Sequence, residues 1–144
     1  MREIKFRGKR ESDGRWIFGY YFVESNIHKI HYENDAGIFE LRIIPTTIGQ
    51  YTGLKDSNGT EIYEGDIITS DYYPYEIHGA PNYNCEVSWF VATASFGYTM
   101  RCVNKHSQGG LSHQTEKMEE EEMKDFKVIG NIHDNPELLE AQDE

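Results

Sequence analysis

The chain has 144 residues, a common length for one domain and enough to bury a core without disulfides or metals. Its formal net charge is −11 and its only cysteines are Cys85 and Cys102, which excludes a disulfide framework and nucleic-acid binding over the whole surface. No stretch approaches the ~18 apolar residues of a membrane span, and the first ten residues lack an apolar signal core, so we expect a cytoplasmic protein without a membrane partner.

Short apolar runs separated by Gly, Asn and Asp indicate β-strands, and the ten Tyr, seven Phe and two Trp support this. The first strand is predicted at 4–8, and the Asp13-Gly14 step predicts a hairpin turn after it. The next strand, 16–23, is predicted to be central and buried by sheet or subunit on both faces, because both alternating sets are apolar: Trp16, Phe18, Tyr20 and Phe22, and Ile17, Tyr21 and Val23.

A second hairpin is predicted from 27–32 and 38–44, with its turn at 34–37. Pro45 ends it, because proline has no N–H for the ladder. Residues 46–53 contain too many glycines and β-branched residues for a helix, so we interpret them as an irregular connector. The strongest turn signal is at 56–59, between short runs at 51–54 and 61–63, and another strand follows from Gly65 to Thr69.

In the second half, residues 71–84 and 104–113 are predicted loops and 85–91 with 96–103 a hairpin. If its turn is centred near Thr93-Ala94, the two cysteines face each other, but we expect free thiols in a reducing compartment. Residues 116–125 predict a short solvated helix, because Met118 and Met123 give no apolar stripe. A strand at 126–132 precedes a short helix at 137–141, with Asn135 as candidate cap and Pro136 in the first turn.

Together these elements predict one mostly-β domain over 1–144, made of short antiparallel strands with one or two short helices near the C-terminus. The loop 71–84 is the best place to divide it into packed halves 1–70 and 85–144. The strands at 66–69, 86–90, 96–102 and 127–132 are predicted to form a small barrel-like sheet.

Three stretches resemble a known family: MREIKFRGKR, GQYTGLKDSNGTEIYEGDII and FKVIGNIHDNPELLE. On them the chain is identified as a member of the YopX protein family, which occurs in phages and prophages. The resemblance implies a β-rich pseudobarrel with no established activity and provides no catalytic residues to carry over, and it is silent over 71–84 and 119–122. The motif residues themselves predict turns, at Gly53, Gly59 and Gly65, and core positions, so they indicate a fold more clearly than a site.

The two ends of the chain have opposite charge. Residues 1–15 have six basic residues against three acidic ones, and residues 116–144 have three against eleven. Solvated charge with pairing between neighbouring termini, head-to-tail contact between subunits, and a phosphate site on the basic arm all stay open. The candidate binding residues of that arm are Arg2, Lys5, Arg7, Lys9 and Arg10, of which Lys5, Arg7 and Lys9 alternate onto one strand face.

Aromatic residues give a second set of binding candidates, Trp89 and Tyr98, which could stack bases on a β surface together with Phe90 and Phe96. Packing in the core or in a subunit interface is the favoured interpretation of the same residues. These positions do not decide between a binding surface and a core.

Metal and nucleophile chemistry have weak support. Glu61, Glu64 and Asp66 cluster near a turn, as a magnesium-dependent enzyme would need, but Asp66 is more simply explained as an acceptor for backbone N–H groups. Among the scattered histidines, His106 and His113 could share a loop metal site, although surface histidines are the simpler interpretation. No nucleophile motif is present.

The leading hypothesis is therefore a non-enzymatic phage or prophage accessory protein that binds a host or phage protein and forms a homo-oligomer. The alternative is a nucleic-acid-binding module that uses the basic N-terminal strand. A divalent-metal-dependent enzyme centred on Glu61, Glu64 and Asp66 is the third hypothesis, and we expect no cofactor.

Overall fold

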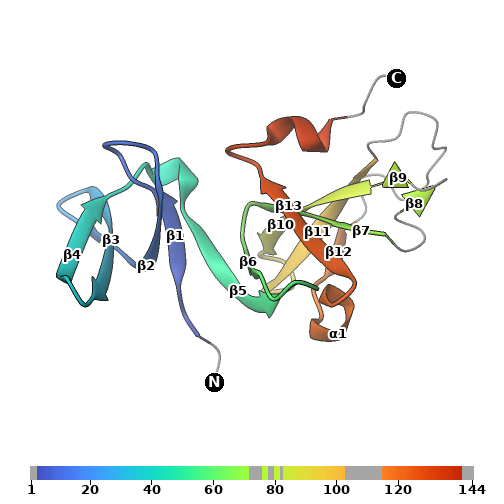
Figure 1. Ribbon diagram of the computed structural model, residues 1–144, viewed down its shortest axis with the longest axis horizontal. Coiled ribbons are helices and arrows are strands. Elements are labelled where there is room, and N and C mark those ends of the chain that lie inside the picture. The colour runs from blue at the N-terminus through green and yellow to red at the C-terminus, as the bar shows by residue number, and fades with distance from the viewer. Residues whose placement is uncertain (1–2, 72–75, 78–79, 82, 103–114, 141–144) are drawn as a thin grey trace. The chain divides into compact units, whose positions relative to one another are not determined.

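The computed structural model describes residues 3–71, 76–77, 80–81, 83–102 and 115–140 (Figure 1). The chain divides into an N-terminal unit, Met1–Gly53, and a C-terminal unit, Leu54–Glu144. Within the described residues the strands pair antiparallel and are accompanied by one four-residue α-helix and two short 3₁₀ turns. The mostly-β prediction is confirmed, but the described sheets are open and do not close into a barrel. None of the helices in these segments is long and apolar enough to cross a membrane.

The N-terminal unit is an antiparallel sheet in the order β4-β3-β2-β1-β5, and β5 continues into the C-terminal unit, where β6 is its neighbour. Asp13 Oδ1 accepts the N–H of Arg15 at 3.1 Å and Asn34 Oδ1 accepts the N–H of Ala36 at 2.8 Å, so side chains stabilise both predicted hairpin turns. Its elements are β1 (Phe6–Lys9), β2 (Trp16–Glu24), β3 (Ile27–Asn34), β4 (Gly37–Arg42), η1 (Pro45–Thr47) and β5 (Gly49–Lys55).

One face of this sheet forms a small core around Ile30 and Ile43, which are 0% and 1% exposed. Gly19 lets β3 come close, since a Cβ on it would lie 2.3 Å from the carbonyl oxygen of His31. β2 lies between β1 and β3, as predicted for a central strand. Among the described residues its two faces are not both buried, because Tyr20 is 65% exposed.

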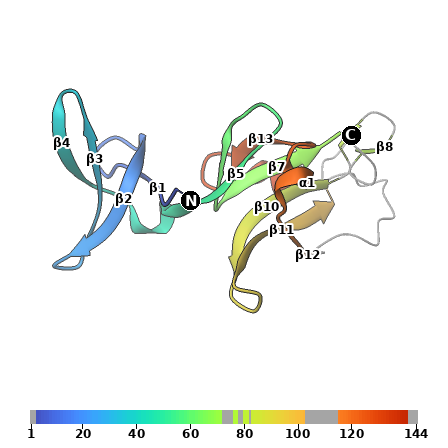
Figure 2. The ribbon, with the colours of Figure 1, turned by 90° about the horizontal axis from the view of Figure 1, so that it is seen from below.

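The C-terminal unit contains a second antiparallel sheet in the order β12-β11-β10-β7-β13. β10 and β11 form its long hairpin, which Figure 2 shows clearly. The elements are β6 (Glu61–Tyr63), β7 (Asp66–Ser70), β8 (Glu76–Ile77), β9 (Ala80–Pro81), β10 (Tyr83–Phe90), β11 (Ser95–Cys102), β12 (Thr115–Lys117), α1 (Glu120–Met123), β13 (Phe126–Asn131) and η2 (Pro136–Leu139). Its core contains Ile62, Ile68, Tyr83, Cys85, Val87, Phe96, Tyr98, Met100, Met118, Met123 and Phe126.

Three local predictions are corrected. Residues 46–53 are not an irregular connector, since η1 and β5 occupy most of them and β5 pairs with β1. The acidic segment is not a solvated helix: β12 precedes a single helical turn, and Met118 and Met123 are 6% and 0% exposed because they close the core. The terminal helix is a 3₁₀ turn, and Asn135 makes no side-chain cap to it but accepts the N–H of Asn131 at 3.3 Å.

The division between the units also differs from the sequence expectation of a boundary at 71–84. β7 pairs with β10 on one side and β13 on the other, so residues before and after 71–84 share one sheet. The hairpin register differs as well, because Cys85 is opposite Met100 and Cys102 is opposite Tyr83. The two cysteines are therefore not cross-strand partners.

Candidate functional site

Alternation along β1 places Arg7 and Lys9 on one side of the N-terminal sheet, as predicted, and Lys5, just before β1, lies on that side against the Tyr51 ring. The register pairs Lys9 with Trp16 and Arg7 with Phe18, so the basic residues share this side with the even-numbered aromatics of β2. The register of β3 and β4 adds further basic residues to the same side. We call it the cationic-aromatic face, made of Lys5, Arg7, Lys9, Trp16, Phe18, Tyr20, Phe22, Lys29, His31, Arg42 and Tyr51. The same registers also place Ile38 and three acidic residues, Glu24, Glu33 and Glu40, on this side.

Cations and rings are stacked on this face. The Arg7 guanidinium lies 4.6 Å from the ring centroid of Trp16, and Lys9 Nζ lies 5.5 Å from the same centroid. Lys5 Nζ is 5.5 Å from the ring centroid of Tyr51 on β5. Such contacts contribute about 0.5–1 kcal/mol each at exposed sites, so they hold the rings in place.

Solvent reaches other rings of the face. Tyr20 is 65% exposed and Phe18 is 46% exposed, whereas Tyr51 is 5% exposed. Lys5 is partly exposed, with its Nζ 3.3 Å from Glu3. Two open aromatic side chains thus lie among partly exposed cations.

The basic residues predicted to bind a ligand differ in how far they are available on this face. Arg7 is 8% exposed and therefore positions Trp16 rather than meeting solvent. Arg10 Nε donates to Ser12 Oγ at 2.7 Å and lies 3.4 Å from Asp13, so it stabilises the turn. Arg2 lies outside the described residues.

Sequence reasoning missed the basic residues that β3 and β4 add to the face. Lys29 Nζ is 3.2 Å from Glu24 and 5.9 Å from the ring centroid of Phe22, and Arg42 is its cross-strand partner. His31 lies between two carboxylates, Glu33 at 3.2 Å and Glu40 at 3.8 Å. Only the strand register shows that these residues join the face, and no local pattern reveals that register.

The two aromatic candidates of the C-terminal unit differ from each other. Tyr98 is 0% exposed, its ring lies 5.3 Å from Phe126, and its hydroxyl donates to Glu122 at 2.6 Å. Tyr98 is therefore a core residue and not a stacking platform, which corrects its place among the binding candidates. Trp89 is 43% exposed and packs edge-on against Phe96 at 4.9 Å.

The acidic cluster is used by the fold. Asp66 is 2% exposed, and its Oδ2 accepts the N–H of Tyr63 at 2.7 Å, as the simpler interpretation predicted. The Tyr63 hydroxyl donates to Glu61 at 3.0 Å. No group of three His, Cys, Asp or Glu side chains suited to a metal ion occurs in the described segments, and His106 and His113 fall outside them.

Cys85 is a free, buried cysteine in the core. Burial, and secondarily the charge of Glu122, raises the pKa of its thiol well above the ordinary range. A thiol that keeps its proton is a poor nucleophile. Cys85 therefore fits a core position better than the position of a nucleophile.

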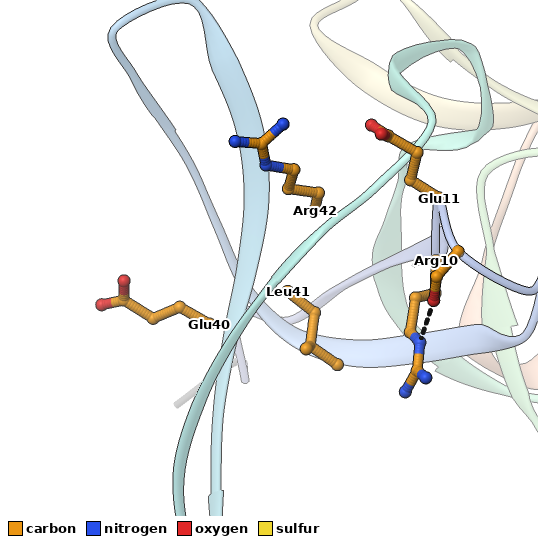
Figure 3. A pocket seen from close by; sticks show the side chains of 6 residues that line it. Arg10, Glu11, Glu40, Leu41 and Arg42 are labelled. Atoms are coloured by element: carbon orange, nitrogen blue, oxygen red, sulfur yellow. Dashed lines mark hydrogen bonds between the residues drawn. The ribbon is translucent and has the colours of Figure 1, made fainter.

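A shallow groove of about 400 Å³ lies beside β4 (Figure 3). Its lining residues are Arg10, Glu11, Ser12, Glu40, Leu41 and Arg42. Figure 3 shows the guanidinium groups of Arg10 and Arg42 pointing away from each other, with acidic side chains beside them. The groove does not focus positive charge on one point, so it is not a built anion site.

Comparison with known proteins places this geometry in a family. A model of the YopX protein family matches residues 2–140. The chain belongs to the YopX protein family. The crystal structure of protein EF1440 from Enterococcus faecalis is similar, with a TM-score of 0.55 and 23% identity over 97% of this chain and 100% of that one. This likeness supports the fold alone, and no curated protein matches the chain.

The central and C-terminal motifs of this YopX-family chain meet in the C-terminal unit. Asp56 Oδ1 accepts the N–H groups of Asn58 at 2.8 Å and Thr60 at 2.9 Å, and its Oδ2 accepts the N–H of Val128 at 2.9 Å. The carbonyl of Gly65 accepts the N–H of Ile132 at 2.8 Å. The central and C-terminal motifs are thus hydrogen-bonded to each other, as expected for sequence that specifies a fold.

Proposed function

We propose that the protein is a non-enzymatic binding module that binds single-stranded nucleic acid on the cationic-aromatic face of its N-terminal unit. The observation that supports this most directly is the exposure of Tyr20 and Phe18 on the face that also contains Lys5 and Lys9. Single-strand binders combine rings that stack bases with cations that follow the phosphates. This arrangement favours nucleic acid over the protein partner that the sequence alone placed first.

The distribution of charge agrees with a local site. Residues 1–53 contain eight Lys and Arg against seven Asp and Glu, a formal charge of +1. Residues 54–144 contain six against eighteen, a formal charge of −12. Phosphate is therefore not repelled by the N-terminal unit, although the chain as a whole is acidic.

The test is fluorescence anisotropy of a labelled single-stranded oligonucleotide of about 12 nucleotides, a length within the range of known single-strand sites. We expect binding at low salt that weakens with a log–log slope of about −0.7 per phosphate contacted, and weaker binding to duplex of the same sequence. Absence of binding at low salt would contradict the proposal.

Matched variants locate the site. Tyr20→Ala should weaken binding about 5- to 150-fold, since stacking on one aromatic residue contributes about 1–3 kcal/mol. Trp89→Ala removes an exposed ring of the C-terminal unit and should leave binding unchanged. If Trp89→Ala weakens binding and Tyr20→Ala does not, the site lies on the other unit.

Variants that remove positive charge complete the test. Lys5→Ser with Lys9→Ser should lower both the affinity and the salt slope, because both cations lie on the face. Arg15→Ser is the control, since its side chain is 81% exposed and lies before β2. Equal effects of the two changes would indicate nonspecific attraction to any cation.

A second candidate is binding of a protein through the C-terminal unit. Its formal charge of −12 and the exposed acidic side chains Glu119, Glu120 and Glu121 favour a basic partner. The resemblance supports a phage or prophage origin, and with it a host or phage protein as that partner. Affinity capture from host lysate, repeated with these three glutamates changed to glutamine, would test it.

A further inference from the structure

The outer edge of β4 is open. β4 ends the sheet, and β3 is the only strand paired with it in the part of the chain that the structure describes. Just beyond it, Ile43 donates its N–H to His28 on β3 at 3.0 Å, and Arg42 turns its carbonyl the other way to accept the N–H of Glu11 at 2.9 Å. Because this direction alternates along a strand, the N–H and C=O groups of Ile38 and Glu40 point away from β3.

The open part of the β4 edge is short and has few of the features that keep an edge strand from pairing with another strand. Glu11 occupies the edge at Arg42, so Gly37–Leu41 is open. Its register with β3 has no bulge, it contains neither Lys nor Pro, and Ile38 is 67% exposed. Edge strands normally carry such protections, because an open edge pairs with any available strand.

We propose that β4 pairs antiparallel with β4 of a second copy of this chain. Residues 37–41 overlap fully when Phe39 lies opposite Phe39 of the second copy, at the two-fold axis. Ile38 and Glu40 then exchange backbone hydrogen bonds with Glu40 and Ile38 of the second copy, about four bonds in all. Phe39 already stacks on Tyr32, with centroids 5.0 Å apart and planes at 17°, so the pairing extends two aromatic rings to four across the axis.

The groove beside β4 fits a second copy in this register. Gly37 of the second copy faces Leu41, so the turn residues Asp35 and Ala36 of that copy reach the groove, whose lining contains Arg10 and Arg42 together with Glu11 and Glu40 (Figure 3). Ala36 of the second copy lies opposite Arg42 in this register, so the Asp35 carboxylate approaches the Arg42 guanidinium, whereas Arg10 points away and stays with Asp13 (Figure 3). Two-fold symmetry repeats this contact at the other end of the interface.

Other registers are worse. A shift toward Arg42 needs an edge that Glu11 occupies, and it would bring Glu40 opposite Glu40 of the second copy. A shift the other way shortens the overlap. In the favoured register each Glu40 faces Ile38 of the other copy and keeps His31 at 3.8 Å on its own strand pair.

Sedimentation equilibrium over a wide concentration range, without nucleic acid, tests the proposal. We expect a monomer–dimer equilibrium that Glu40→Pro abolishes, because it removes two of the bonds across the axis and none to β3. Circular dichroism would show that this variant is folded. A monomer at every concentration would overturn the proposal, even if oligonucleotide binding is found.

Charge reversal gives a second variant set that leaves the backbone intact. Asp35→Lys and Arg42→Glu should each weaken the dimer about tenfold or more, and the double variant should recover much of the loss. In addition, Phe39→Cys should form a covalent dimer on mild oxidation and Leu41→Cys should not, with the unaltered chain as control for its own cysteines. If the chain forms a dimer that none of these changes weakens, the dimer uses another surface and the proposal is wrong. If the chain is monomeric and binds a different protein through β4, the strand that pairs with β4 belongs to that protein, which also overturns the proposal.

Discussion

The two units use their apolar residues in different ways. Seven large hydrophobic side chains are exposed among the described residues, and five of them lie in the N-terminal unit: Ile4, Phe18, Tyr20, Val23 and Ile38. The C-terminal unit instead buries eleven residues in one cluster. Similar β-strands thus leave apolar side chains on the surface of one unit and bury them in the core of the other.

The largest expected effect is the loss of stability when a core residue of the C-terminal unit is truncated. Phe126→Ala removes a ring that is 1% exposed and should lower the free energy of unfolding of the C-terminal unit by about 3–5 kcal/mol. Ile38→Ala, in an exposed position, should change the stability of the monomer by less than about 0.5 kcal/mol. Denaturant unfolding at low protein concentration measures both. Equal losses would show that the two units do not differ in this way.

A polar link in the C-terminal unit should have the next largest effect. Asp56→Ala leaves the N–H groups of Asn58, Thr60 and Val128 without their acceptor, so we expect a loss of about 3 kcal/mol. Asp56→Asn keeps one carbonyl acceptor and should lose about half as much. Denaturant unfolding measures the loss, and faster amide exchange at Val128 would locate it. A loss below about 0.5 kcal/mol for Asp56→Ala would mean that water replaces the carboxylate.

A pair of glycine substitutions sharpens the comparison by affecting one unit at a time. Gly19→Ala places a Cβ 2.3 Å from the His31 carbonyl oxygen, and Gly97→Ala places one 2.3 Å from the Phe90 ring. Each should destabilise its own unit by about 1–3 kcal/mol. In ¹H–¹⁵N spectra, Gly19→Ala should shift the resonances of residues 3–53 and leave the cluster around Ile68 unchanged, with the reverse for Gly97→Ala. Widespread shifts in both variants would show that the units respond as one.

Local chemistry explains which elements could be predicted from sequence. The turns at Asp13-Gly14 and 34–37 depend on side chains that bond within two residues, so composition reveals them. The run at 51–54 predicted the end of β5, but its start at Gly49 and Gln50 was missed because these two residues join the strand through their pairing with β1. Met118 and Met123 were missed as core because a strand and a helical turn, not one helix, bring them to the same cluster.

The candidate site also has features that the sequence could predict and features that it could not. Alternation along one strand was enough to place Lys5, Arg7 and Lys9 on one face. The burial of Arg7 beneath Trp16, the contribution of Lys29 and Arg42, and the burial of Tyr98 all depend on registers between strands. Register arises from long-range pairing and packing, so periodicity in a single sequence does not specify it.

The smallest expected effect tests how well the C-terminal core excludes water, and it involves Cys85. Burial raises the pKa of its thiol, so the folded chain keeps this proton at a pH where the unfolded chain loses it. The contribution to stability is fully present below the unfolded pKa and declines above it, by about 1 kcal/mol between pH 8 and 9.5. Unfolding of the unaltered chain and of Cys85→Ala at these two pH values isolates this part, because the difference between them cancels the titration of other groups. If the two proteins lose equal stability over this range, the thiol ionises in the folded state and the core beside β10 admits water.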